Sequence, residues 1–179
     1  MKKNLFILFA LLFISSAVLA QKGNNQFLVG AEVGFPLGSF DNFNTGIGLV
    51  AKALLGLGEH SQIGFTTGYT AFKRSDSDEN SKIKTSVLPL LASYRHRLNV
   101  LYFEPQLGYG IYTTTIKTQT GGTSMKSKNS NGGFTWAVGT GVQISALDLG
   151  VRYQAGYPGG GTVGFFGIHA AYVFRPARR

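Results

Sequence analysis

The stretch LDLGVRYQAGY, residues 147–157, decides the fold. Its odd-numbered positions are apolar or aromatic, whereas its even-numbered positions are charged, amide or glycine. Successive side chains of a β-strand point to opposite faces, so an alternation with period two predicts a strand that lies between two different environments. Residues 147–157 are therefore expected to form a strand with Val151 and Tyr153 on the apolar face and Arg152 on the polar face.

The same alternation recurs along the chain, first at 27–35 and then roughly at 45–57, 62–72, 83–95, 100–113, 134–144 and 162–174. The connections between these segments alternate in length, with 58–60, 96–99 and 145–146 short and 36–44, 73–82 and 114–133 long. Long connections at one rim and tight turns at the other are typical of outer-membrane barrels. The sequence predicts an all-β protein, an eight-stranded antiparallel up-and-down transmembrane β-barrel.

The polar face of these strands is poor in charge. Charged residues make up only 14% of the chain, where a soluble protein usually carries about 25%, and 25 residues are glycine. A barrel of eight strands has an interior only just wide enough for side chains, so glycines must alternate there with larger residues. The polar face is therefore expected to line a narrow lumen, and the apolar face to contact lipid.

About one charged residue per strand falls on the predicted lumen face: Glu32, Lys52, Arg95, Glu104 and Arg152. Buried charges require partners. Glu32 and Lys52 lie on neighbouring strands, and Glu104, Arg95 and Arg152 could share one network. We expect a structural network of ion pairs that fills the tube, and the alternative is a path for ions or protons.

The first twenty residues have the three parts of a secretory signal: Lys2 and Lys3, an apolar stretch over 5–14, and small residues before Gln21. We expect a signal peptide over 1–20 that is cleaved after Ala20, and one barrel domain over 21–179. The chain contains no cysteine, which excludes disulfides and a lipid-modified cysteine. No run of 18 apolar residues follows the signal, so any membrane crossing must use strands.

Several stretches resemble the small Gram-negative outer-membrane barrels of the OmpA, OmpX and OmpW type: residues 87–91 (VLPLL), 103–110 (FEPQLGYG) and 136–141 (WAVGTG). The resemblance covers the whole of 21–179 as a pattern. It implies an outer-membrane location with both termini in the periplasm, contact with membrane lipid and lipopolysaccharide, and insertion by the barrel assembly machinery. It also implies a monomer that binds no nucleic acid.

Catalytic and metal sites are not expected. The three histidines have no zinc-ligand spacing, no cofactor motif is present, and Ser61 beside His60 is the nearest candidate nucleophile. The connection 114–133 contains Lys117, Lys126 and Lys128 without any acidic residue, and we expect it to be an exposed loop. Its lysines could contact anionic lipopolysaccharide, a glycan or a host surface, or serve only solubility.

The sequence thus predicts a non-enzymatic outer-membrane barrel with a largely filled lumen, whose long loops have envelope-structural or surface-contact roles. Two alternatives stay open. One is a narrow channel for small solutes or hydrophobic compounds. The other is a soluble periplasmic barrel that binds an apolar ligand, in which Val151 and Tyr153 would point inward.

Overall fold

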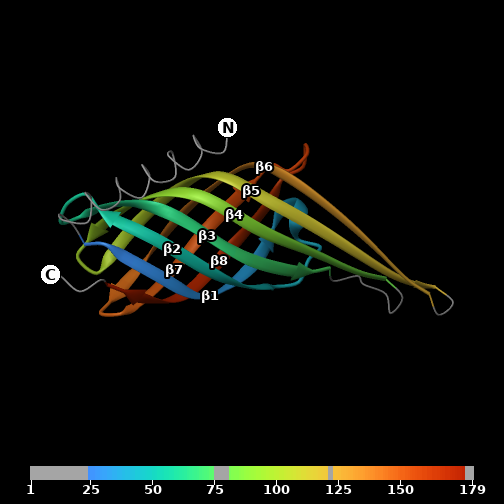
Figure 1. Cartoon of the computed structure of the whole chain (residues 1–179), viewed down its shortest axis with the longest axis horizontal. Helices are drawn as coiled ribbons and strands as arrows, with labels where there is room; N and C mark the ends of the chain where they lie inside the picture. The colour runs from blue at the N-terminus through green and yellow to red at the C-terminus, as the bar shows by residue number, and fades with distance from the viewer. Residues whose placement is uncertain (1–23, 75–80, 121–122, 176–179) are drawn as a thin grey trace, which may run out of the picture.

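The computed structural model describes residues 24–74, 81–120 and 123–175, which form a single closed antiparallel barrel (Figure 1). Each strand pairs with the next in the chain, and the last strand closes the barrel on the first. The strands are β1 (Gln26–Leu37), β2 (Gly46–Gly56), β3 (Ser61–Lys73), β4 (Ser81–Leu98), β5 (Leu101–Thr120), β6 (Thr123–Ile144), β7 (Leu147–Gly156) and β8 (Val163–Phe174). The predicted fold class is confirmed. The predicted signal peptide and its cleavage point lie outside the described residues.

The barrel is strongly sheared. A row of paired residues that starts at Gln26 passes through all eight strands and returns to β1 at Pro36, ten residues farther along. Such a stagger tilts the strands against the barrel axis, which is visible in Figure 1. The tilt brings side chains of strands that are not neighbours close together inside the lumen.

The two rims differ. The turn rim carries the connections 57–60, 99–100 and 145–146 together with both described ends of the chain, as the hydrogen bond from Arg175 Nη2 to the Ser145 carbonyl shows (2.8 Å). Asn99 and Ser145 begin the two-residue turns with positive φ values of 60° and 54°. The hairpin rim carries the other four connections. The helical element of the described residues is a 3-10 turn, η1 (Gly38–Phe40). The described residues contain no helix that is long and apolar enough to cross a membrane.

The described residues of the connection 114–133 form strands and not a loop, so this prediction was wrong. β5 and β6 continue as a paired hairpin to Thr120 and Thr123, well beyond the hairpin rim (Figure 1). Threonines favour extended backbone, and hydroxyls such as those of Thr113 and Ser130 pair across the strands at 2.8 Å. A polar segment that lacks the apolar alternation can therefore still be a strand once it projects beyond the lipid-facing band.

The alternation divides the two faces as predicted. In β7, Asp148 and Arg152 are buried while Leu147 and Leu149 are exposed, and the outward side chains Ile47, Leu49 and Leu107 are 72, 64 and 62% exposed. Outward aromatic side chains gather toward both rims: Phe27, Tyr94, Phe103, Tyr172 and Phe174 at one, and Phe35, Tyr69, Tyr109, Phe134 and Tyr157 at the other. An apolar band with aromatic girdles is the outer surface of a membrane barrel. This surface does not fit a soluble barrel with its apolar face inside.

Pro89 and Pro105 lie within β4 and β5, where each lacks an amide proton for the ladder. The pairing of β3 with β4 is interrupted opposite Pro89, and that of β4 with β5 opposite Pro105, but the register is the same on both sides of each gap. The two prolines therefore cause local gaps without a bulge.

Candidate functional site

The lumen is filled by two adjacent polar layers and an aromatic layer, stacked along the barrel axis. All five charged residues predicted for the lumen are buried there, each at most 2% exposed. Asp148 joins them, so the buried charges of the described residues are three acidic (Glu32, Glu104, Asp148) and three basic (Lys52, Arg95, Arg152). The lumen therefore carries no net charge when His169 is neutral.

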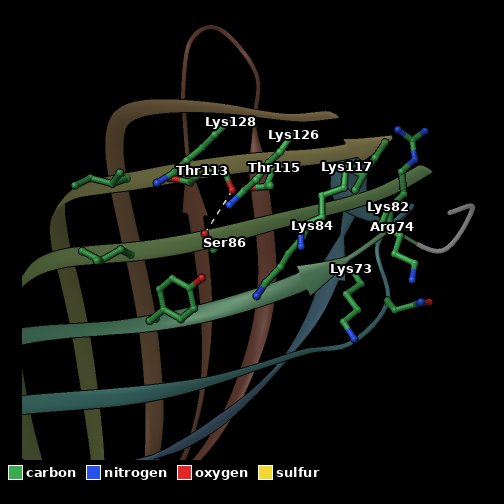
Figure 2. Close-up of a pocket in the computed structure, with 15 residues that line it drawn as sticks. Lys73, Arg74, Lys82, Lys84, Ser86, Thr113, Thr115, Lys117, Lys126 and Lys128 are labelled. Carbon is green, nitrogen blue, oxygen red and sulfur yellow. Dashed lines mark hydrogen bonds between the residues drawn. The ribbon is translucent and has the colours of Figure 1, made fainter. Parts of the chain in front are cut away.

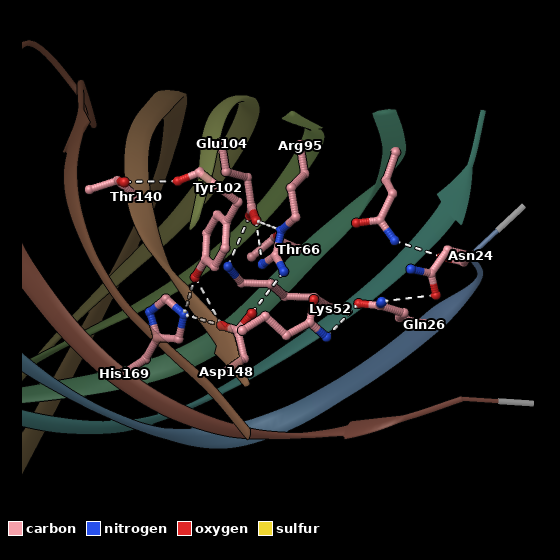
Figure 3. Close-up of polar contacts among 12 residues, drawn as sticks. Asn24, Gln26, Lys52, Thr66, Arg95, Tyr102, Glu104, Thr140, Asp148 and His169 are labelled. Atoms are coloured by element: carbon pink, nitrogen blue, oxygen red, sulfur yellow. Dashed lines mark hydrogen bonds and ion pairs between the residues drawn. The ribbon is translucent and has the colours of Figure 1, made fainter. Parts of the chain in front are cut away.

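The layer nearest the turn rim is centred on Glu104 of β5 (Figure 3). Its carboxylate accepts hydrogen bonds from Lys52 Nζ at 2.9 Å and from Arg95 Nε at 2.6 Å, and it also contacts the amide of Gln106. Arg95 reaches across the lumen to Asp148 Oδ2 at 2.7 Å. One arginine thus connects two carboxylates on strands that are not neighbours.

Asp148 extends this layer toward β8. Its Oδ1 accepts a hydrogen bond from the Tyr102 hydroxyl at 2.9 Å and lies 3.1 Å from His169 Nε2. The Arg95 guanidinium lies over the Tyr102 ring, 3.7 Å from its centroid, which places a cation on an aromatic face. These contacts satisfy both carboxylate oxygens and fix the arginine in the centre of the tube (Figure 3).

The second layer is the pair Arg152 and Glu32. Arg152 Nε and Nη2 donate to the two Glu32 oxygens at 2.8 and 2.9 Å, and Thr70 donates to the same carboxylate at 3.2 Å. The two residues come from β7 and β1, which are separated by β8. Gly167 of β8 lies opposite Arg152 and leaves the room for this bidentate contact, since a Cβ there would be 2.9 Å from Glu32 Oε2. Two-pronged arginine–carboxylate contacts are among the strongest polar interactions in proteins.

A Gly167→Val substitution is expected to destabilise the barrel by about 1–3 kcal/mol, because the new side chain would intrude between Glu32 and Arg152. Ala170→Val on the same strand is the control, since Ala170 faces outward. Urea-dependent unfolding in lipid vesicles measures both variants. Equal stabilities would show that the ion pair does not need the space at Gly167.

Toward the hairpin rim the lumen becomes aromatic. Phe165 lies 5.9 Å from the Arg152 guanidinium carbon, Phe72 lies 5.3 Å from Phe165, and Phe40 of η1 lies 5.0 Å from Phe72 between ring centroids. Val87 and Tyr112 complete this buried cluster. Gly34 leaves room for the Phe72 ring, because a Cβ there would be 2.9 Å from its tip. The aromatic layer closes the tube directly next to the ion pairs.

The structure shows which lumen charges pair with each other, a point that the sequence left open. Glu32 does not pair with Lys52 on the neighbouring strand, because the register places Glu32 opposite Gly48 and Lys52 opposite Leu28. Each charge instead finds its partner through the lumen: Lys52 with Glu104, and Glu32 with Arg152. Asp148 was missed as a network member, although it lies on the same face of the same strand as Arg152.

The remaining candidates from the sequence are His169 and Ser61. His169 is buried in the lumen, and the Ser61 hydroxyl lies 3.1 Å from the Tyr94 hydroxyl, an exposed contact that activates neither group. Within the described ranges, no group of three or more histidine or carboxylate side chains could hold a metal ion. The lumen network has the geometry of a structural core.

Lys117, Lys126 and Lys128 lie on the outer face of the projecting hairpin of β5 and β6, not in a loop. They line a groove of about 790 Å³ together with Lys73, Arg74, Lys82 and Lys84 (Figure 2). No carboxylate is among the described residues that line this groove. The acidic residues Asp76, Asp78 and Glu79 of the adjoining connection lie outside the described residues.

No protein-family model matches the sequence, and no curated protein matches it either. Solved structures do match. The attachment invasion locus protein Ail of Yersinia pestis, in complex with the heparin analogue sucrose octasulfate, has a TM-score of 0.65 at 13% identity over 86% of this chain and 99% of Ail. Neisserial surface protein A has a TM-score of 0.53 at 16% identity, over 85% of this chain and 97% of its own.

The N-terminal β-barrel domain of Pseudomonas aeruginosa OprF has a TM-score of 0.52 at 10% identity, over 86% of this chain and all of that domain. At such identities the likeness concerns the fold. These neighbours, the closed eight-stranded topology and the outward apolar band agree with one another. The chain therefore has the fold of the small eight-stranded outer-membrane β-barrels of Gram-negative bacteria.

Proposed function

We propose that the chain is a non-enzymatic, integral outer-membrane barrel with a closed lumen, which acts in envelope structure or surface contact through the parts that project beyond the hairpin rim. The observation that carries this proposal is the continuous filling of the lumen. Two ion-paired layers and an aromatic layer follow each other along the axis, with contacts of 2.6–3.2 Å between polar groups and of 5.0 and 5.3 Å between ring centroids. The scaffold is rigid, and its projecting part is available for contact.

The orientation follows from the same proposal. Small outer-membrane barrels have short periplasmic turns and longer extracellular connections. The turn rim with both chain ends would then face the periplasm, and the long hairpin of β5 and β6 would project from the cell. The known complex of Ail with a heparin analogue supports a surface role for this kind of barrel, although the low identity transfers no binding site.

In planar lipid bilayers the purified barrel is expected to give no steady single-channel current, because neither a polar nor an apolar path passes the aromatic layer. Flotation of the same protein with vesicles and a heat-dependent shift in gel mobility provide the control, since they report insertion and barrel closure. Steady currents from inserted protein would favour the channel alternative over a filled lumen. Recovery of the chain in the soluble periplasm would contradict the proposed location.

A further inference from the structure

The outer face of β3 to β6 beyond the hairpin rim carries six lysines that have no ion pair within the described part of the chain: Lys73, Lys82, Lys84, Lys117, Lys126 and Lys128. The strand register places several of them directly opposite one another. Lys73 faces Lys84, and Lys117 faces both Lys82 and Lys126. Like charges on facing positions of antiparallel strands are destabilising. The facing lysines form two adjacent rows, Lys73–Lys84 on β3 and β4 and Lys82–Lys117–Lys126 on β4 to β6. These two lysine rows cost stability unless an anion lies on them.

The chemical character of the outward side chains changes in a regular order from the apolar band toward these lysines. On β4 the outward positions read Leu88, Ser86, Lys84 and Lys82 toward the projecting end. On β5 the matching outward positions read Ile111, Thr113, Thr115 and Lys117. Figure 2 shows the hydroxyls and lysines of both strands on the same side. The order on each strand is apolar, hydroxyl, cation.

This order runs outward from the lipid-facing band. Tyr69, Leu88 and Ile111 form the lower border of the groove and continue the apolar surface, with Tyr69 47% and Ile111 37% exposed. From Leu88 to Lys84 the strand rises about 13 Å, at roughly 3.3 Å per residue. The groove therefore spans the distance from the end of the hydrocarbon region to the head groups, and it faces sideways into the membrane surface.

We infer that this groove binds a phosphorylated glycolipid of the surrounding outer leaflet, with its acyl chains against the lower border, its sugar at the hydroxyls and its phosphates on the two lysine rows. Lysine binds phosphate as a point charge, and several lysines around one head group suit more than one phosphate. The inference rests on the proposed location in the outer membrane and names the partner of the projecting surface. A soluble polyanion would not need the apolar border.

Binding can be tested with the purified full barrel in phosphatidylcholine nanodiscs that contain either bis-phosphorylated lipid A or lipid A without phosphates. Native mass spectrometry of the released protein reports the lipid that stays bound. The triple variant K82Q/K117Q/K126Q is expected to lose roughly tenfold or more of its affinity for the bis-phosphorylated form, because each charge-assisted contact to phosphate is strong. Lipid A without phosphates is expected to bind weakly to both proteins. Equal retention of the two lipids by the unmodified barrel would overturn the inference.

The single variant Lys117→Gln gives a second, independent test. In phosphatidylcholine alone it is expected to raise the thermal midpoint, because it removes repulsion with Lys82 and Lys126. With bis-phosphorylated lipid A present it is expected to lower the midpoint, because a phosphate contact is lost. Arg175→Gln removes an exposed cation at the turn rim, and its shift of the thermal midpoint should have the same sign in the two membranes. A shift of Lys117→Gln in the same direction in both membranes would contradict the inference.

Two further ligands separate the possible sources of the anion. The deacylated bis-phosphorylated disaccharide is expected to bind at least roughly tenfold more weakly than the intact lipid, because it cannot use the apolar border. Equal affinity would show that the groove takes a free phosphorylated sugar. Preferential binding of a heparin oligosaccharide would show that the ligand of the groove is a soluble sulfated glycan and not the lipid. If the barrel is inserted and non-conducting but shows no preference at all, the inference fails while the proposed function stands.

Discussion

Replacing Glu32 with alanine is expected to destabilise the folded barrel by about 3–5 kcal/mol, because Arg152 would keep its buried charge without a partner. Both side chains are at most 2% exposed, so water cannot take over the lost contacts. Thr70 and the facing His169 cannot replace the carboxylate, since neither is an anion. Urea-dependent unfolding in lipid vesicles, followed by tryptophan fluorescence, measures the loss.

The control for this prediction removes both charges at once. The double variant Glu32→Leu with Arg152→Met should be much more stable than Glu32→Ala, because a buried pair replaced by apolar groups of similar volume leaves no uncompensated charge. A loss below about 1 kcal/mol for Glu32→Ala would mean that solvent screens Arg152. The lumen would then be wet, which would favour the channel alternative.

Val151→Arg is expected to destabilise the barrel in a membrane by about 2–4 kcal/mol, because it places a charge in lipid near the middle of the apolar band. Val151 lies midway along β7 and points away from the lumen, next to the buried Arg152. Thr115→Arg is the control, since Thr115 has the same outward orientation but lies among the lysines beyond the band. The measurement is the free energy of unfolding in lipid vesicles for both variants.

The depth of the substituted position is what this pair compares. If Val151→Arg and Thr115→Arg had equal effects, the outward face at Val151 would not lie in hydrocarbon, and the proposed location would lose its main physical support. Repeating the comparison in detergent with short chains should reduce the difference, because water reaches the arginine more easily there.

The strands and the direction of their faces could be predicted from the sequence because each strand has one wet and one lipid-facing side. The alternation over 147–157 is direct evidence of two environments, and Glu32, Lys52, Arg95, Glu104 and Arg152 all lie inside as this pattern predicted. The hairpin of β5 and β6 could not be predicted in the same way. Beyond the apolar band both faces meet water, so Thr115 and Lys128 show no contrast that would mark a strand.

The pairing partners of the lumen charges could not be predicted from the sequence either. Glu32 and Lys52 lie on adjacent strands, but whether they can pair depends on a register that the local sequence pattern does not contain. The stagger of the barrel decides that Glu32 meets Arg152 across β8. The two lysine rows illustrate the same difficulty, since their lysines face one another only through the registers of three strand pairs.

The contact between β7 and β1 across Gly167 has a consequence for the lifetime of the barrel. Arg152 and Glu32 are 120 residues apart, so their contact forms only after the first and last strands have met. Contacts of such long range are made late in folding, because the chain must close a large loop before they are gained. Interactions absent from the transition state slow unfolding more than they speed folding. The ion pair between Arg152 and Glu32 is therefore expected to slow the unfolding of the closed barrel, so that an inserted copy has a long lifetime without any covalent cross-link.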